Sequence, residues 1–424
     1  MKVAVIGGGS TYTPELIEGL IAHRDDLGLA EVALMDIEPE RLAVVGDFCR
    51  RMVEHSGAGF RVAVTTDRGA ALDQASFVLT QIRVGGQPGR HKDIQLGLRH
   101  GLVGQETTGV GGFAKALRTV PVILDICKEM EARCPQAWLI NFTNPSGLVT
   151  EAILKHGRER AIGLCNNPIN LKIDVAKYLG VKPEQVQLDY IGLNHLSWVR
   201  RILVDGKDVL PQALEAVTGA GRPANIPEEL DYPPGFLKSL GMIPSSYLRY
   251  YYLTRQAVAE LQAKTKSRAE EVMEVEEELM AVYRDSNAHE KPAALSKRGG
   301  ANYSRAAFEL IRAIHLDLSE IHVVNTRNQS TITCLPPDCA VEVACRVDAA
   351  GADPLPLDPP GPQIRGLIQH VKAYEELAVQ AAVSRSRRVA ILALSTHPLV
   401  ADVELSETLV QEIENDHGIQ FSED

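Results

Sequence analysis

The stretch that decides the fold is KVAVIGGGSTYTPEL, residues 2–16, near the start of the chain. Its first five residues form a short, mostly apolar run that leads directly into three glycines, and residues 14–23 then show helical periodicity. A buried strand that turns through glycines into a helix is the opening of a βαβ unit. Residues 31–36 (EVALMD) and 39–55 repeat this order as a further strand and helix, so the chain begins with an α/β unit.

The alternation of strands and helices continues beyond this unit. Residues 76–82 and 136–141 have strand character, and a helical stretch near 116–132 lies between them. Alternation of this kind predicts a parallel sheet that helices cover on both faces. Two later runs, 186–191 and 198–204, are assigned instead to a different, antiparallel sheet.

The chain is long enough for more than one domain. Its 424 residues correspond to about two or three domains of ordinary size. We predict a Rossmann-like doubly wound domain over residues 1–195 and an α+β domain over residues 196–424, because the alternation stops near residues 170–200. The proline-rich stretch 349–362 is either a domain linker or a rigid loop inside the second domain.

The second half of the chain contains an amphipathic helix over residues 267–283. Ser267 and Glu270 form a capping-box pair at its start. The apolar side chains that share one face are Val272, Val275, Leu279 and Val282. The charged run from Glu274 to Glu278 is predicted to lie mostly on the solvated side of this helix.

Composition and charge exclude several classes of protein. With 45% apolar and 23% charged residues the chain has the balance of a soluble globular protein. Its net charge of −11 argues against nucleic-acid binding, which needs a basic face. No apolar run approaches the roughly 18–20 residues that span a bilayer, and the initial apolar run is too short for a signal peptide. The seven cysteines form no CxxC pair, so we expect reduced thiols, no structural zinc and a cytoplasmic location.

The glycine loop after the first strand predicts a dinucleotide site. Glycines allow the backbone to approach a pyrophosphate, and the following helix offers free N–H groups to it. Asp36 ends the second strand, where an acid accepts hydrogen bonds from a ribose and favours NAD over NADP. The third glycine of the usual motif is replaced by Tyr12. The predicted cofactor-binding residues are Gly7, Gly8, Gly9, Ser10, Thr11 and Asp36.

Cys165 and His195 are candidate metal ligands. Cys165 lies in GLCNNP (163–168) and His195 in GLNH (192–195), and both follow strand-like runs that can end at a common crevice. A thiolate and an imidazole suit a transition metal and leave coordination positions open for a substrate. The alternatives are a buried core cysteine and a histidine with a local hydrogen bond. The segment Asn141–Pro145 also closes a strand at the end where ligands bind in doubly wound sheets.

Together these motifs resemble glycoside hydrolase family 4, the NAD- and divalent-metal-dependent glycosidases, which depart from the usual two-carboxylate chemistry. The matching segments follow one another along the chain from residue 7 to residue 304. They are GGGSTYTPEL (7–16), IRVGG (82–86), GLVGQETTGVGG (101–112), NFTNP (141–145), GLCNNP (163–168), GLNHLSW (192–198), PSSYLRYYY (244–252), SRAEEVMEVE (267–276) and KRGGANYS (297–304). The resemblance implies the fold of this family and of the lactate and malate dehydrogenases.

The resemblance also implies roles for individual residues. Cys165 and His195 match the metal ligands, usually for manganese, and Tyr247 matches the catalytic base. The residues that match substrate-contacting positions are Arg90, Asn144, Asn166, Arg268 and Arg298. Asn166 directly follows the metal cysteine, as in the 6-phospho-β-glucosidase subgroup, although Asn167 replaces the valine usual there. Residues 325–340 and the loop 349–362 depart from the family pattern, which weakens the resemblance in the last hundred residues.

The implied activity is hydrolysis of phosphorylated β-glucosides such as cellobiose-6-phosphate. In the implied mechanism NAD⁺ oxidises carbon 3 of the sugar, Tyr247 removes the carbon-2 proton, the aglycone is eliminated, and water adds before the hydride returns. The alternatives are a family 4 enzyme of α-glucoside or phospho-α-glucoside specificity and a plain NAD-dependent hydroxy-acid dehydrogenase. The resemblance further implies a homodimer or homotetramer, whereas charge and hydropathy predict neither a nucleic-acid nor a membrane partner.

Overall fold

A nine-stranded sheet forms the centre of the molecule, and its strands follow the order β13-β12-β11-β6-β5-β4-β1-β2-β3. The computed structural model describes residues 1–217, 231–233, 235–299 and 302–422. The parallel strands are β1 (Lys2–Ile6), β2 (Glu31–Met35), β3 (Arg61–Thr65), β4 (Phe77–Thr80), β5 (Trp138–Asn141) and β6 (Ala161–Gly163). The order β3-β2-β1-β4-β5-β6 is that of a Rossmann fold, so the predicted α/β fold class is confirmed.

Three later strands extend this sheet beyond β6. They are β11 (Glu320–Arg327), β12 (Ala340–Asp348) and β13 (Gly351–Pro354), and all pair antiparallel. β11 joins the parallel part where Asn325 pairs with Gly163. Residues 351–354 of the proline-rich stretch therefore form the edge strand of this sheet. The division at residue 195 stays a prediction, and strands from both sides of it share one sheet.

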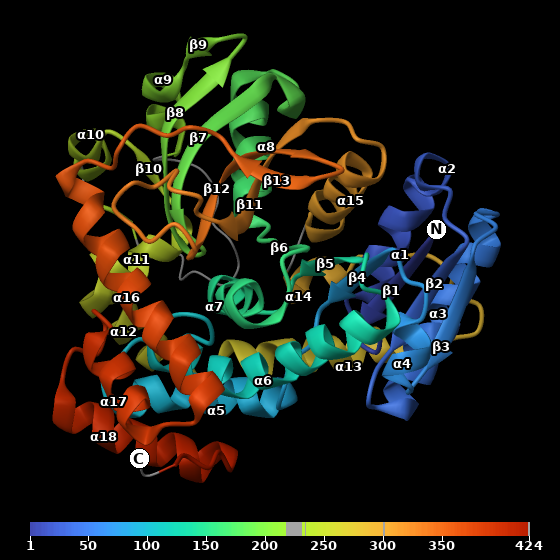
Figure 1. Ribbon diagram of the computed structural model, residues 1–424, viewed down its shortest axis with the longest axis horizontal. Helices are drawn as coiled ribbons and strands as arrows, with labels where there is room; N and C mark the ends of the chain where they lie inside the picture. The colour runs from blue at the N-terminus through green and yellow to red at the C-terminus, as the bar shows by residue number, and fades with distance from the viewer. Residues whose placement is uncertain (218–230, 234, 300–301, 423–424) are drawn as a thin grey trace.

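The α-helices of the first half are α1 (Thr13–Ala22), α2 (Arg24–Leu27), α3 (Pro39–Ser56), α4 (Arg68–Leu72), α5 (Gly86–Arg99), α6 (Gly109–Arg133), α7 (Ser146–Ala152), α8 (Asn167–Leu179) and α9 (Leu210–Val217). Those of the second half are α10 (Phe236–Leu240), α11 (Arg249–Tyr252), α12 (Thr254–Ala263), α13 (Arg268–Arg284), α14 (Leu295–Arg298), α15 (Tyr303–His315), α16 (Pro362–Ser384), α17 (Arg387–Thr396) and α18 (Val403–His417). There are also a short π-helix, η1 (Ile153–Gly157), and two short 3₁₀ helices, η2 (Pro183–Gln185) and η3 (Ser246–Leu248). Figure 1 shows α1–α4 with β1–β3 at one end of the molecule and α16–α18 at the other. No helix in the described ranges is long and apolar enough to cross a bilayer.

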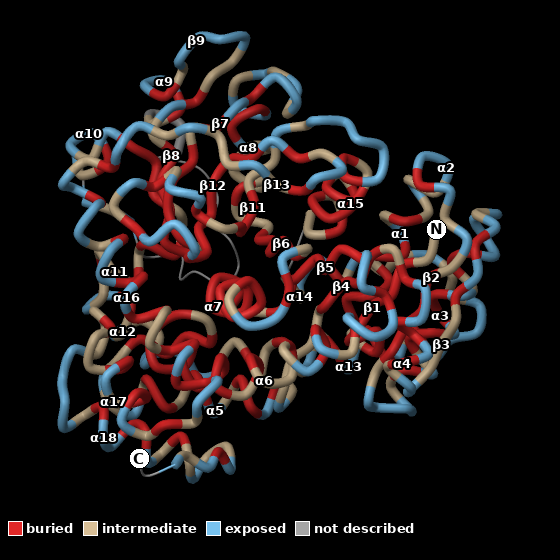
Figure 2. The backbone as a smooth tube through the Cα atoms, in the orientation of Figure 1, coloured by how far each residue is buried: buried red, intermediate tan, exposed pale blue. Residues whose placement is uncertain are grey.

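The two faces of the parallel sheet belong to two separate apolar cores. Val3 and Val5 of β1 pack with α1 and α3, whereas Ala4 and Ile6 pack with α4 and α6. This division follows from the two-residue period of a strand, which sends alternate side chains to opposite faces. Helix α7 is buried at every residue and lies at the centre of the molecule (Figure 2).

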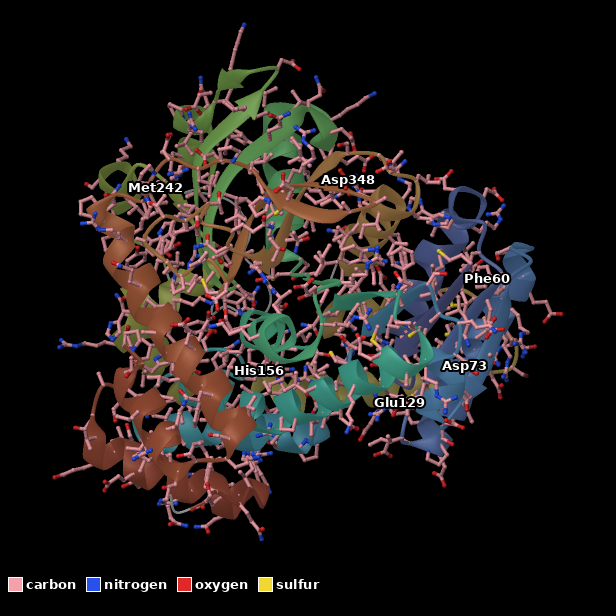
Figure 3. The ribbon with its side chains drawn as sticks, viewed as in Figure 1. Phe60, Asp73, Glu129, His156, Met242 and Asp348 are labelled. Carbon is pink, nitrogen blue, oxygen red and sulfur yellow. The ribbon has the colours of Figure 1, made fainter. Side chains whose placement is uncertain are left out.

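A second, antiparallel sheet carries one of the predicted site residues. It consists of β7 (Val186–Leu193), β8 (Leu196–Val204), β9 (Lys207–Asp208) and β10 (Ile243–Pro244). This confirms the antiparallel pairing predicted for 186–191 and 198–204. The turn that joins β7 to β8 contains His195 in a left-handed conformation, with φ of 64°. Figure 3 shows side chains filling the space between the layers, with Met242 and Phe60 at opposite ends.

The predicted helix with its capping box is confirmed, but the prediction that its charged run faces solvent is partly wrong. Ser267 accepts from the backbone N–H of Glu270, and Glu270 accepts in return from the N–H of Ser267. Glu276, however, is 9% exposed rather than solvated as predicted. Helix α13 packs against both α3 and α5, so this carboxylate points into a contact between helices and pairs with Arg41 and Arg298.

Candidate active site

The carboxyl ends of the parallel strands bring several predicted site residues to one edge of the sheet. β1 leads into the glycine loop, β2 into Asp36, and β6 into Cys165 after one further residue. Gly163 at the end of β6 has no room for a side chain, because a Cβ there would lie 2.1 Å from Oγ1 of Thr150. The sheet therefore holds the backbone before Cys165 tightly against its neighbours.

The sulfur of Cys165 is buried inside a set of hydrogen-bond donors. The backbone N–H of Asn167, the side-chain amide of Asn194 and the hydroxyl of Tyr303 all donate to it. Burial, followed by the nearby carboxylate of Glu342, nevertheless raises the pKa of the Cys165 thiol to about 12. Three donors around one sulfur stabilise a thiolate, and the thiolate is the form of cysteine that binds a metal. The donor set therefore fits a cation that would displace the thiol proton.

His195 is held as a neutral imidazole. Burial lowers the pKa of His195 to about 3, and neutral imidazole is the metal-binding form. Its Nδ1 lies 3.1 Å from Oγ1 of Thr107, which leaves Nε2 as the second possible ligand atom. A hydrogen bond on one ring nitrogen commonly orients the other toward a metal.

Tyr247, in η3, connects these two residues. Its ring is stacked on that of His195, with centroids 3.6 Å apart and planes 5° apart. Burial, and then negative charge on Cys165, raise the pKa of Tyr247 well above 10. Asn194, which binds the Cys165 sulfur, is the chain neighbour of His195. The structure thus brings Cys165, His195 and Tyr247 into one cluster.

A second cluster places three cations around one buried carboxylate, Glu106. Arg83 pairs with it directly, Nε of Arg90 lies 2.9 Å from Oε1, and Nζ of Lys115 lies 2.6 Å from Oε2. Burial opposes ionisation, but the three cations hold the pKa of Glu106 well below its usual value. Burial and then Arg83 lower the pKa of Lys115 to about 7. The cluster retains positive charge that an anionic ligand could neutralise.

Arg90 and Arg268 line the same open pocket, together with Glu106 and Tyr250. Arg268 donates to Glu271 and to the backbone carbonyl of Lys297, and both hydrogen bonds fix its direction. Asn144 lies elsewhere, beside Tyr303, to which its amide donates. The carbonyl oxygen Oδ1 of Asn144 is buried, and no group in the described part of the chain donates to it. Such a group is available to a ligand hydroxyl.

Arg298 lies at the glycine loop. Its Nε donates to Oγ1 of Thr11 at 2.7 Å, and Nη2 donates to Oγ of Ser10 at 3.3 Å. Glu276 accepts from Arg41 at 3.0 Å and ion-pairs with Arg298, which joins α3, α13 and α14 at this loop. The guanidinium of Arg298 therefore lies at the predicted dinucleotide site, while its backbone carbonyl accepts from Arg268 at 3.4 Å.

The glycine loop and Asp36 are in direct contact. The backbone N–H of Gly9 donates to Oδ2 of Asp36 at 2.9 Å, and a Cβ at Gly9 would lie 2.9 Å from the same oxygen. Gly7 has φ of 94°, which few residues other than glycine adopt. Tyr12, in place of the usual third glycine, is the N-cap residue of α1. These features fit a bound dinucleotide.

Several residues of the site were not predicted from the sequence. Glu106 and Tyr303 lie inside matched segments, GLVGQETTGVGG and KRGGANYS, and Asn194 is next to His195. Their positions were therefore visible, but not their contacts. Lys115 and Glu342 gave no signal, because they reach the site only through packing. Asn166 is the half-buried N-cap residue of α8, next to Cys165.

Comparison with known proteins supplies a family for this arrangement. The sequence model described as family 4 glycosyl hydrolase matches residues 2–181, and that of the family 4 C-terminal domain matches residues 190–400. A probable 6-phospho-β-glucosidase of Bacillus subtilis is 42% identical over 428 residues, covering 98% of this chain and 96% of that protein.

Solved structures agree with this match. The 6-phospho-β-glucosidase of Thermotoga maritima, in complex with manganese, NAD⁺ and glucose-6-phosphate, has a TM-score of 0.92 and 37% identity, with 100% of both chains covered. A malate dehydrogenase of Plasmodium falciparum has a TM-score of 0.56 at 13% identity, covering 90% of this chain and 98% of that one. The second likeness concerns the fold alone and agrees with the dehydrogenase-like architecture predicted from the sequence.

Proposed function

The chain belongs to the family 4 glycosyl hydrolases, and from this premise we propose that it is a 6-phospho-β-glucosidase that requires NAD⁺ and a divalent metal, most simply manganese. The observation that carries the proposal is the 42% identity to a probable 6-phospho-β-glucosidase across nearly the whole chain. The relative from Thermotoga maritima, which has the same fold, binds manganese, NAD⁺ and glucose-6-phosphate together.

The metal would be held by Cys165 and His195. Two protein ligands leave several coordination positions for oxygens of the sugar. Asn194, Tyr303 and the N–H of Asn167 would orient the sulfur, and Thr107 would orient the imidazole. NAD⁺ would lie on Gly7, Gly8, Gly9, Ser10 and Thr11, with its ribose at Asp36. Arg298 supports this loop through Ser10 and Thr11, so we propose that it serves the dinucleotide rather than the sugar phosphate.

When bound, NAD⁺ supplies a hydride acceptor for carbon 3 of the sugar, and the metal supplies a Lewis acid for the resulting ketone. Tyr247 then removes the carbon-2 proton as its phenolate. Because burial raises the pKa of Tyr247, this residue needs a nearby cation to ionise near neutral pH. The ring contact with His195 keeps the phenol beside the ligands of that cation. Expulsion of the aglycone from carbon 1 and addition of water there would complete the hydrolysis with no net redox change.

The sugar phosphate would be bound by the pocket that Arg90 and Arg268 line. Guanidinium groups match phosphate oxygens in geometry and charge, and the cluster around Glu106 adds further positive charge. Asn144 would accept from a sugar hydroxyl through its unpaired Oδ1. Asn166, at the position where other family members carry an acid, could only donate a hydrogen bond to the leaving group. This suits elimination from an enolate, which needs little protonation of the leaving group.

Four substrates test the specificity: cellobiose-6-phosphate, maltose-6-phosphate and their unphosphorylated parents. We expect turnover of cellobiose-6-phosphate well above that of the other three. Equal turnover of maltose-6-phosphate would contradict the β specificity, and equal turnover of cellobiose would contradict the requirement for phosphate.

The redox route is tested separately. Enzyme stripped of nucleotide should be inactive and should recover with NAD⁺, and a chelator should abolish activity until manganese returns. Product formed in deuterium oxide should carry deuterium at carbon 2. Full turnover without NAD⁺, or stoichiometric release of NADH, would contradict the mechanism, and the second result is the one expected of a hydroxy-acid dehydrogenase.

We further propose that the protein is cytoplasmic and forms a homodimer or homotetramer. All seven cysteines lie in the described ranges as free thiols, which suits a reducing compartment. Val383, Leu392 and Val403 of α16–α18 are exposed apolar side chains at one end of the molecule, where a second copy could cover them. Light scattering after size-exclusion chromatography would give the oligomeric state, and a monomer would contradict the proposal.

A further inference from the structure

A group of possible metal-binding side chains lies away from the candidate active site. His55 is in the last turn of α3, and His289 and Glu290 follow the end of α13. One donor atom from each of the three lies within 4.8 Å of the others. His289 is half-buried, and the other two are exposed. Residues separated by more than two hundred positions thus present two imidazoles and a carboxylate to one point.

The hydrogen bond of His289 fixes which of its nitrogens could bind a metal. Nδ1 of His289 lies 2.9 Å from the backbone carbonyl oxygen of Asn287. A carbonyl oxygen can only accept, so Nδ1 carries the proton, and in the neutral ring Nε2 keeps a free lone pair. An Nδ1–H to carbonyl hydrogen bond is the usual support of a histidine that ligates through Nε2. This contact is independent of the proximity of the three side chains.

The backbone that carries His289 is fixed to α3. Arg51, one helical turn before His55, donates from Nε to the carbonyl of Ala288 at 2.8 Å and from Nη2 to the carbonyls of Tyr283 and Asp285 at 2.7 and 3.0 Å. The imidazole rings of His55 and His289 are consequently close, with centroids 3.7 Å apart. Neither His55 nor Glu290 makes a hydrogen bond or ion pair with another side chain that the structure describes.

We propose that His55, His289 and Glu290 form a second metal site, which binds a divalent transition ion of the zinc class. Imidazole and carboxylate ligands are typical of Zn²⁺, and nitrogen ligands favour it over Mn²⁺. Tetrahedral coordination at about 2.0–2.1 Å places the donor atoms about 3.3 Å from one another. Exposed side chains can reach this separation from 4.8 Å by rotating, and water completes the coordination.

The bound ion would cross-link two parts of the chain that build the candidate active site. Helices α3 and α13 are in contact, and an ion pair between Arg41 of α3 and Glu276 of α13 already joins them near the glycine loop. Figure 1 shows the labels of these two helices near each other. The ion would therefore hold α3 and the end of α13 together and would raise thermal stability without taking part in the reaction. This role does not depend on the proposed glycosidase activity.

Zinc titration of the full-length, tag-free enzyme, stripped of metal and held with NAD⁺, tests the proposal by calorimetry. We expect two equivalents of Zn²⁺ for the native enzyme and one for H55A, for H289A and for C165S. The double variant C165S/H289A should bind none. H156A is the matched control, because His156 is exposed, lies far from Phe60 and the end of α3 (Figure 3), and should keep both equivalents.

Two further measurements separate the site from the catalytic metal. Zn²⁺ should raise the melting temperature of C165S but leave that of C165S/H289A unchanged. The manganese-dependent turnover of H289A should stay within about twofold of the native value, since surface substitutions away from a site have small effects. A native enzyme with a single zinc equivalent, or a second equivalent that survives H55A and H289A, would overturn the proposal. Loss of turnover in step with the second equivalent would also overturn it.

Discussion

Two buried carboxylates in the candidate active site, Glu106 and Glu342, have opposite surroundings. Arg83, Arg90 and Lys115 surround Glu106 and hold its pKa well below the usual value. Burial raises the pKa of Glu342 to about 7, although four neutral groups donate to it. The donors to Glu342 are the side chains of Asn194, Tyr190, Asn325 and Ser197.

The difference indicates what each side of the site can bind. The cationic side, around Glu106, has more positive than negative charge and suits an anion such as a sugar phosphate. The neutral side, around Glu342, contains Cys165, and the largest influences on Glu342 after burial are the four neutral donors. Burial without a counter-charge raises the pKa of both acidic groups, and a cation bound beside them would favour their charged forms. The neutral side therefore suits a metal ion, and the following substitutions test the two sides separately.

The largest effect is expected from Cys165→Ser, on the neutral side. Metal assistance contributes several kcal/mol to a transition state, which corresponds to a loss of about 1,000-fold or more in kcat. Steady-state assays with excess manganese should not restore the rate. Cys334→Ser, at a half-exposed cysteine in the loop before β12, is the matched control and should keep native turnover. Rescue of Cys165→Ser by manganese would remove Cys165 from the ligand set.

Tyr247→Phe should have the next largest effect. Loss of a general base typically lowers the rate by about 10²–10⁴-fold, and the phenyl ring should keep its contact with His195. We expect kcat to fall while binding of NAD⁺ and manganese persists, and deuterium exchange at carbon 2 should fall in parallel. Tyr251→Phe is the control, because Tyr251 lies in the same pocket as His195. If exchange were lost in Tyr251→Phe instead, the base would be Tyr251.

The two sides of the site also differ in how much of each could be predicted from the sequence alone. Cys165 and His195 follow strand-like runs and lie in short matched segments, so local sequence identified them as candidates. On the cationic side, Arg83 and Glu106 also lie in matched segments and Arg90 matched a substrate-contacting position, but nothing local predicted that these side chains meet. Glu106 acquires its role from Arg83, Arg90 and Lys115, which approach it from three points on α5, α6 and the loop after β4. Such contacts depend on tertiary packing, which no local period encodes.

In the fold, too, the parts that neighbouring residues encode were predictable, whereas the parts that depend on tertiary packing were not. The strand, glycine loop and helix of residues 2–23 are encoded by neighbouring residues, and the structure reproduces them within one or two positions. The extension of the sheet by β11 was not predictable, because it depends on the pairing of Asn325 with Gly163. Glu276 was assigned to solvent from its charged neighbours, whereas helix packing buries it.

On the cationic side, Arg268→Ala should raise KM for cellobiose-6-phosphate by about 10–100-fold. A charge-assisted hydrogen bond to a phosphate contributes about 1.5–3 kcal/mol, and most of this binding energy is present before the chemical step. KM for an unphosphorylated β-glucoside should not change, because that substrate has no phosphate for Arg268 to bind. Arg255→Ala, at an exposed arginine of α12, is the control. Equal increases in KM for both substrates would indicate a general defect rather than loss of a phosphate contact.

The smallest effect concerns pH and involves Lys115. Because its pKa is about 7, Lys115 gains a proton as pH falls from 8 to 6, which adds positive charge to the cationic side and strengthens anion binding. A sugar phosphate loses its second charge near its own pKa of about 6, which weakens binding at lower pH. Glu106 stays ionised throughout this range, because its pKa is held well below the usual value. Glucose-6-phosphate, as a competitive inhibitor, should therefore bind most tightly between about pH 6 and 7, with a change of a few-fold on each side.

In Lys115→Met the alkaline decline should disappear while the acidic decline remains. If both declines persisted in that variant, the alkaline one would belong to another group, and Lys115 would not supply the titrating charge.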